Sequence, residues 1–109
     1  MWLRPADEVS TDPAGYARVA IEHVVAQAPR WWLHIDLDVL ARREFAACGA
    51  PGEVMLAGGL TWPQLTQIGK SAIQDSGCSG WSLAIYNPDL DPDRSAARRI
   101  VEFVAQVAG

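Results

Sequence analysis

The stretch WWLHIDLDVL, residues 31–40, decides the fold of this chain. Its first six residues are mostly apolar, and such a short run is typical of a strand covered by other elements. Asp36 and Asp38 follow, separated by one leucine. The stretch therefore predicts a covered strand with two carboxylates at its carboxyl end.

The residues before this strand predict a helix. Thr11-Asp12-Pro13 combines a capping side chain with proline at the first helical position. Pro29 ends the helix, and residues 1–4 are expected to form a short strand or a fragment of one. The apolar residues that recur at helical spacing, and that we expect to form one buried stripe, are Ala17, Ile21, Val24 and Ala28.

The residues after the two aspartates predict a long loop and a second helix. Residues 41–57 have no clear hydrophobic period, and we expect a loop with one helical turn at residues 43–47. After Gly58-Gly59, the sequence TWPQ at residues 61–64 is a capping-box pattern. The helix is expected to end at Gly77. Its expected apolar face consists of Leu65, Ile68, Ala72 and Ile73.

A second strand and a last helix follow. Residues 81–86 predict the strand, and residues 87–93 predict a loop in which Asp93 caps the helix. The apolar stripe expected on this last helix consists of Ala97, Ile100, Val101, Val104 and Ala108.

The alternation of strands and helices predicts an α/β fold. We expect a short parallel sheet with flanking helices and right-handed crossovers, in a single domain of residues 1–109. In such sheets the chemistry lies beyond the carboxyl ends of the strands. Asp36 and Asp38 hold that position on one strand, and residues 87–93 hold it on the other.

Composition excludes several classes of protein. Half of the 109 residues are hydrophobic, which is typical of a globular domain, and the net charge of −4 does not favour nucleic-acid binding. No apolar run is long enough to span a membrane. Cys48 and Cys78 lack a CxxC spacing, so we expect free thiols and a reducing cytoplasm. A local cluster of arginines, which we expect to form a solvated helix face, consists of Arg94, Arg98 and Arg99.

The two aspartates allow two interpretations. Because side chains alternate along a strand, His34, Asp36 and Asp38 share one direction. Two converging carboxylates repel each other unless a cation or a shared proton relieves them, and a divalent metal ion is one solution. The alternative is that both aspartates accept hydrogen bonds from nearby backbone N–H groups.

Histidine and tryptophan side chains near this strand are expected to be structural. A histidine inside a strand is more often a hydrogen-bonded core residue than a ligand, although His34 could extend the row of ligands. His23 lies on the first helix and is expected to be exposed. The tryptophans expected to pack between helices and sheet are Trp31, Trp32, Trp62 and Trp81.

Three segments together resemble a known family. They are LHIDLDVL at residues 33–40, GGLTW at 58–62 and IYNPDLDP at 85–92. Their order and spacing are similar to the C-terminal part of the arginase/agmatinase/formiminoglutamase (ureohydrolase) family, from about residue 30 to residue 109. The resemblance implies part of a three-layer α/β/α fold.

The resemblance also implies an activity. The family hydrolyses guanidino or related C–N bonds of small molecules with two manganese ions. Asp36 and Asp38 would correspond to the metal-bridging aspartates of the family's DxD segment. Metal-activated water would then attack the guanidinium carbon.

Several features of the family pattern are missing from this chain. The family's GGDH-type and DAHxD-type segments, which supply further metal ligands, do not occur. Ala41-Arg42 stands where an aspartate and a proline usually follow, and Ile85 stands where a glutamate is usual. We therefore expect a partial domain, inactive alone, with weak Mn²⁺ binding. We also expect it to self-associate or to pair with a missing N-terminal half-domain through the sheet edge.

Two other functions are compatible with the residues. The sequence IDLDVL also matches the first motif of haloacid-dehalogenase-like phosphatases, with Asp36 as the phosphorylated nucleophile, Asp38 as general acid/base, and magnesium. Lys70 is the only lysine available to such a site. The third interpretation is a non-catalytic α/β module that binds a partner through an exposed sheet edge.

Overall fold

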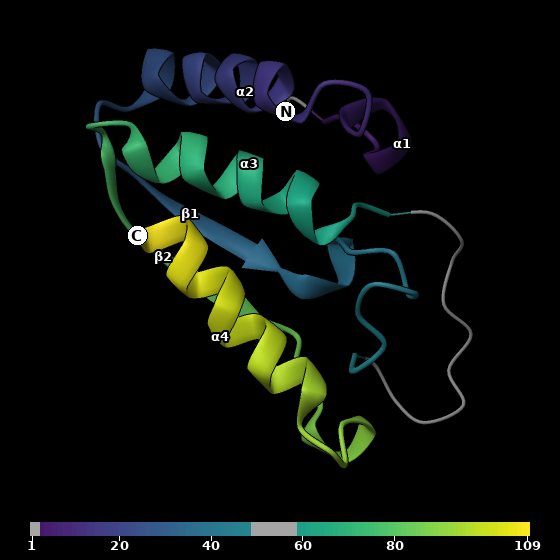
Figure 1. Cartoon of the computed structure of the whole chain (residues 1–109). Helices are drawn as coiled ribbons and strands as arrows, with labels where there is room; N and C mark the ends of the chain where they lie inside the picture. The colour runs from purple at the N-terminus through teal and green to yellow at the C-terminus, as the bar shows by residue number, and fades with distance from the viewer. Residues whose placement is uncertain (1–2, 49–58) are drawn as a thin grey trace.

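The computed structural model describes residues 3–48 and 59–109. Within these ranges the chain forms four helices and two strands, with a 3₁₀ turn after each strand (Figure 1). The elements are α1 (Ala6–Val9), α2 (Pro13–Gln27), β1 (Trp31–Asp36), α3 (Trp62–Gln74), β2 (Cys78–Ala84) and α4 (Ser95–Ala108), and the 3₁₀ turns are Leu37–Val39 and Pro88–Leu90.

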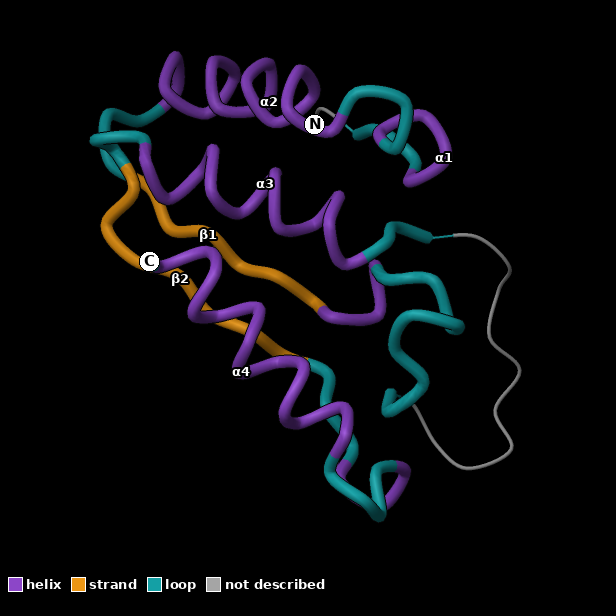
Figure 2. Tube along the Cα trace, viewed as in Figure 1, coloured by secondary structure: helices purple, strands orange, loops and turns teal. Residues whose placement is uncertain are grey.

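The two strands form a parallel sheet (Figure 2). Leu33 pairs with Trp81 and Ile35 pairs with Leu83, so these four side chains share one face of the sheet. The predicted α/β class and parallel pairing are confirmed. The strand expected at residues 31–36 has the predicted bounds, whereas β2 begins three residues earlier and ends two residues earlier than predicted.

The core lies between one face of the sheet and helices α3 and α4. Phe103 of α4 is fully buried, and its ring centroid lies 5.3 Å from that of Trp62 and 6.3 Å from that of Trp81. Ile35 and Leu65 belong to the same buried cluster. Truncating a side chain such as Phe103 in such a core typically costs about 3–5 kcal/mol.

The other face of the sheet is open among the residues that the structure describes. Trp32, His34 and Asp36 of β1 are all exposed, and Trp32 retains 60% of its accessible surface. Trp32 therefore does not pack between helix and sheet, which corrects the prediction for that tryptophan. The prediction of a covered strand holds for one face of β1 only.

Two predicted capping patterns are confirmed. The Asp12 carboxylate accepts a hydrogen bond from the Gly15 N–H at the start of α2. Thr61 and Gln64 form a reciprocal capping box at the start of α3. Capping groups satisfy backbone donors that have no partner within the helix, so both helices begin where the sequence indicates.

The predicted helix faces are partly wrong. On α2 only Ala17 is buried, and Val24 of the predicted stripe is exposed. On α4 the buried residues are Phe103 and Val107, whereas Val101 of the predicted stripe is 67% exposed. The choice between neighbouring apolar stripes depends on the partner surface, which helical spacing alone does not define.

Some local predictions also need correction. Of the strand expected at residues 1–4, residues 3–4 are not in a strand and residues 1–2 lie outside the described residues. The short helix α1 was not predicted. The turn after Ala41 covers residues 42–44 and is not helical. Helix α3 ends at Gln74, before Gly77. Residues 49–57 of the predicted loop, and Gly58, lie outside the described residues. Gly59 has a φ of 118°, a backbone conformation that favours glycine.

Candidate functional site

The predicted carboxylates lie at the carboxyl end of β1. Asp36 is the last residue of the strand, and Asp38 lies in the 3₁₀ turn that follows. Leu37 between them is 1% exposed and anchors the turn in the core, while both aspartates remain exposed. Because β1 and β2 are parallel, this end lies beside the point where β2 leads into residues 85–91.

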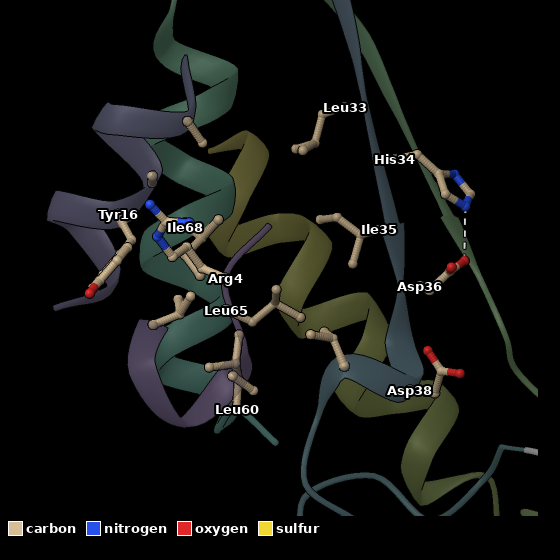
Figure 3. A pocket seen from close by; sticks show the side chains of 15 residues that line it. Arg4, Tyr16, Leu33, His34, Ile35, Asp36, Asp38, Leu60, Leu65 and Ile68 are labelled. Atoms are coloured by element: carbon tan, nitrogen blue, oxygen red, sulfur yellow. Dashed lines mark hydrogen bonds and ion pairs between the residues drawn. The ribbon is translucent and has the colours of Figure 1, made fainter. Parts of the chain in front are cut away.

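His34 joins Asp36 in a hydrogen-bonded chain on the open face (Figure 3). The Nε2 atom of His34 lies 2.9 Å from Asp36 Oδ1, and its Nδ1 atom lies 2.8 Å from Ser82 Oγ. Trp32 Nε1 donates to the same Ser82 oxygen at 3.1 Å. A neutral His34 that donates from Nε2 to Asp36 and accepts from Ser82 satisfies every group in this chain. The prediction of a core histidine is therefore wrong, because the face that carries His34 is uncovered.

The aspartates offer oxygen ligands but do not form a metal cage. No described residue donates a hydrogen bond to the Asp38 carboxylate, and Asp36 has one described partner, His34. Within residues 3–48 and 59–109 no group of three or more His, Cys, Asp or Glu side chains could hold a metal ion. Two exposed carboxylates suit a hard or borderline cation such as Mn²⁺, but most of the ligands would have to come from elsewhere.

A second carboxylate, that of Asp91, lies after β2, and its oxygens already accept hydrogen bonds from within the protein. Asp91 is 3% exposed and accepts hydrogen bonds from the Tyr86 hydroxyl at 2.7 Å and from the backbone N–H groups of Ala96 and Ala97. Burial raises the pKa of Asp91, but these hydrogen bonds outweigh it and leave the pKa below its ordinary value of 3.8. The bond to Asp91 also raises the pKa of the Tyr86 hydroxyl. This carboxylate holds the start of α4.

Asp91 was not predicted as a capping residue. Asp93, which was predicted, does accept a hydrogen bond from the Ser95 N–H at 3.0 Å, and bonds to Ser95 lower the pKa of Asp93. Both aspartates that accept hydrogen bonds from the start of α4 lie in the sequence DPD at residues 91–93. Asp91 reaches the helix because Arg94 adopts a left-handed backbone with a φ of 62° and turns the chain back.

Ile85 immediately follows β2 in an unusual conformation. Its φ is 74°, a value that is strained for a β-branched residue, and its side chain is 41% exposed. This is the position at which the family resemblance placed a glutamate. The backbone strain therefore falls beside the candidate site, at a residue that makes no carboxylate contribution.

The arginine cluster is only partly solvated. The guanidinium carbon of Arg99 lies 4.7 Å from the centroid of the Trp62 ring. Its side chain is 29% exposed and also faces Glu102. The prediction of a solvated face holds for Arg94 and Arg98 but not for Arg99.

Comparison with known proteins now identifies the relatives of this chain. The chain is 32% identical, over 88 residues, to formimidoylglutamases from Klebsiella pneumoniae and Klebsiella aerogenes. Its fold matches that of formimidoylglutamase from Bacillus subtilis with a TM-score of 0.79 at 18% identity, covering 94% of this chain. The chain is a relative of the arginase/ureohydrolase family. No family model matches it.

Arginases share the same arrangement of elements. The arginases of Entamoeba histolytica and Bacillus caldovelox both match with a TM-score of 0.78, over 95% of this chain and 34% of theirs. The chain spans only 26–38% of the length of the formimidoylglutamases above. The predicted family and fold are thus confirmed. The roles of Asp36 and Asp38 stay predictions.

Two further predictions concern the cysteine side chains and membrane-spanning segments. Cys48 and Cys78 are not joined in a disulfide. No helix among the described residues is long and apolar enough to cross a membrane.

Proposed function

We propose that this chain provides the DxD-bearing part of a manganese-dependent C–N hydrolase of the arginase/ureohydrolase family. The supporting observation is the position of Asp36 and Asp38, two exposed carboxylates at the carboxyl end of a parallel strand. In open α/β sheets, ligands bind beyond this end of the strands. Related sequences named formimidoylglutamase make a formimidoyl C–N bond the first candidate substrate, with guanidino groups second.

Asp36 and Asp38 would coordinate the metal ion, and His34 would orient the Asp36 carboxylate through a hydrogen bond. When bound, manganese lowers the pKa of a coordinated water and so supplies a nucleophile near neutral pH. The hydrogen bond from His34 to Oδ1 limits rotation of the Asp36 carboxylate and leaves Oδ2 available. Because no described residue donates a hydrogen bond to the Asp38 carboxylate, Asp38 can bind a cation without first breaking such a bond.

The isolated chain is expected to bind manganese weakly and to be inactive. Two carboxylates fill only part of a coordination sphere of about six ligands, so water must supply the remainder. Ile85 offers no carboxylate beside this end of the sheet. Activity therefore requires ligands from a further polypeptide segment. Because Cys48 and Cys78 are not joined in a disulfide, we expect the protein to act in the reducing cytoplasm.

A chimera tests this function directly. The region of the Klebsiella pneumoniae formimidoylglutamase that aligns with this chain is replaced by the 88 matching residues of this chain, and hydrolysis of formimidoylglutamate is measured with Mn²⁺. We expect turnover that falls at least about a hundredfold in a D36N/D38N chimera, since both carboxylates hold the metal. An N-terminal substitution far from the site, Val25→Ala, is the matched control.

The result that contradicts the proposal is a folded chimera whose activity does not depend on Asp36 and Asp38. A folded chimera that binds two manganese ions but hydrolyses neither formimidoylglutamate nor arginine contradicts it equally. Folding is checked by circular dichroism and metal content by elemental analysis.

A further inference from the structure

A chain of hydrogen-bonded side chains crosses from β2 to the candidate site. The register of the sheet places His34 of β1 opposite Ser82 of β2, so the two side chains lie on the same face. Ser82 Oγ lies 2.8 Å from Nδ1 of His34, and Nε2 of the same ring lies 2.9 Å from Asp36 Oδ1. The chain therefore connects a hydroxyl group on one strand to the carboxylate at the end of the other.

Trp32 determines the direction in which the protons of this chain are donated. Its indole Nε1–H can only donate, and it donates to Ser82 Oγ at 3.1 Å. The hydroxyl proton of Ser82 can then be donated to Nδ1 of His34. A neutral His34 ring carries its own proton on Nε2, which donates to the Asp36 carboxylate. Every donor in the chain therefore has one acceptor.

Gly80 provides the space that the Trp32 ring occupies. The two residues are paired across the strands. A Cβ atom at position 80 would lie 2.5 Å from Cζ3 of Trp32, whereas carbon atoms pack at about 3.5–4.0 Å. Glycine inside a strand commonly marks such a close approach. The absence of a side chain at Gly80 therefore allows the indole Nε1–H to reach Ser82.

The main effect of the chain is on orientation. Asp36 and His34 each keep 53% of their side-chain surface exposed, and a bond between groups so exposed contributes little to stability in water. A single bond at Nε2 leaves the His34 ring free to rotate, whereas the second bond at Nδ1 fixes the plane of the ring. The two bonds together therefore define where the Nε2–H points.

We propose that Ser82 is a positioning residue for the Asp36 carboxylate and acts through His34. By holding Nδ1, Ser82 keeps the Nε2–H directed at Oδ1, so that Oδ2 stays available to a cation. This inference deepens the proposed function and rests on it where metal binding is concerned. The orientation of His34 in the metal-free chain is independent of that function.

NMR of the metal-free chain tests the positioning role first. At pH 8, where an ordinary histidine is neutral, ¹⁵N chemical shifts distinguish a protonated from an unprotonated ring nitrogen. We expect a protonated Nε2 and an unprotonated Nδ1 in His34. The order parameter of the His34 ring, from ¹³C relaxation, should fall from about 0.8 to below about 0.6 in Ser82→Ala, because the ring loses its second attachment.

Three further variants separate this effect from a general change in the strand. Ser82→Thr keeps the hydroxyl group and should restore the rigid ring. Gly80→Ala displaces the Trp32 indole from Ser82 and should loosen the ring less than Ser82→Ala does. Ser79→Ala removes an exposed hydroxyl of the same strand that contacts Arg30 instead, and should leave the His34 ring unchanged.

The affinity for Mn²⁺ alone tests the consequence for metal binding. In an Asp38→Asn background, Asp36 is the carboxylate of the pair that remains. Ser82→Ala should then weaken Mn²⁺ binding about two- to tenfold, less than the 10–100-fold loss typical when a direct partner of a metal ligand is removed. In an Asp36→Asn background the same change should have no effect. Paramagnetic broadening of the amide signals of residues 36–39 measures both affinities.

Three results would overturn the proposal. The first is a His34 ring that is as rigid in Ser82→Ala as in the wild type, and the second is a His34 ring protonated on Nδ1 alone. The third is an equal loss of Mn²⁺ affinity with aspartate or asparagine at position 36. Absence of Mn²⁺ binding in the wild type would instead contradict the proposed function, while a ring that loosens in Ser82→Ala would still support the role of Ser82.

Discussion

The carboxylates at the ends of the two strands differ in how far the protein itself satisfies them. After β2, the buried Asp91 accepts hydrogen bonds from Tyr86 and from two backbone N–H groups of α4. After β1, Asp36 and Asp38 are exposed, and His34 is their one described hydrogen-bond partner. The same residue type therefore stabilises the fold at one strand end and remains available to a ligand at the other.

Removing the saturated carboxylate should have the largest effect on stability. Asp91→Ala leaves the Tyr86 hydroxyl and two N–H groups at the start of α4 without their acceptor. We expect the Tm to fall by about 5–10 °C. Thermal unfolding by circular dichroism measures this, with the exposed Asp89→Ala in the same loop as control. An equal loss in both variants would mean that Asp91 has no special structural role.

The contribution of Asp91 should also depend on pH. Its pKa is lowered in the folded state, so the stabilisation is present above the unfolded value of 3.8 and is lost as pH falls through the folded pKa. The Tm difference between the wild type and Asp91→Asn should therefore be constant near neutral pH and narrow below about pH 3.8. A difference that widens in acid would show that the pKa shift has the opposite sign.

Relief of the strain after β2 should have a smaller effect of the opposite sign. Ile85→Gly removes a β-branched side chain from a backbone with a φ of 74°. We expect stabilisation of about 0.5–1 kcal/mol, because the loss of strain exceeds the added entropy of the unfolded chain. Urea unfolding measures it. Destabilisation would indicate that the half-exposed Ile85 side chain contributes packing that outweighs the strain.

Changing the open carboxylates should have the smallest effect on stability. Asp36→Asn and Asp38→Asn, singly or together, should shift the Tm by less than about 2 °C, since both side chains are exposed and the one described contact, between Asp36 and the exposed His34, contributes little in water. Differential scanning calorimetry without added metal provides the measurement. A loss of Tm comparable to that of Asp91→Ala would show that Asp36 and Asp38 stabilise the fold. The carboxylates at the two strand ends would then have the same role.

The sequence predicts local features well and their surroundings less well. The bounds of β1 and the capping box of α3 follow from residues that lie next to one another, so the pattern alone defines them. The exposure of His34 and the buried stripe of α4 depend on which surfaces are covered, and that is decided by packing. Asp91 illustrates the same limit, because its partners are reached only after the chain turns back at Arg94.

Manganese-induced broadening of NMR signals tests the central claim most directly. Mn²⁺ is added at increasing concentration to the isotope-labelled chain, and the amide signals after β1 are compared with those after β2. The account predicts that signals of residues 36–39 broaden first, that those of residues 91–97 persist, and that D36N/D38N removes the difference. Earlier broadening of the signals around Asp91, or equal broadening near all carboxylates, would contradict the assignment of Asp36 and Asp38 as the metal-binding pair.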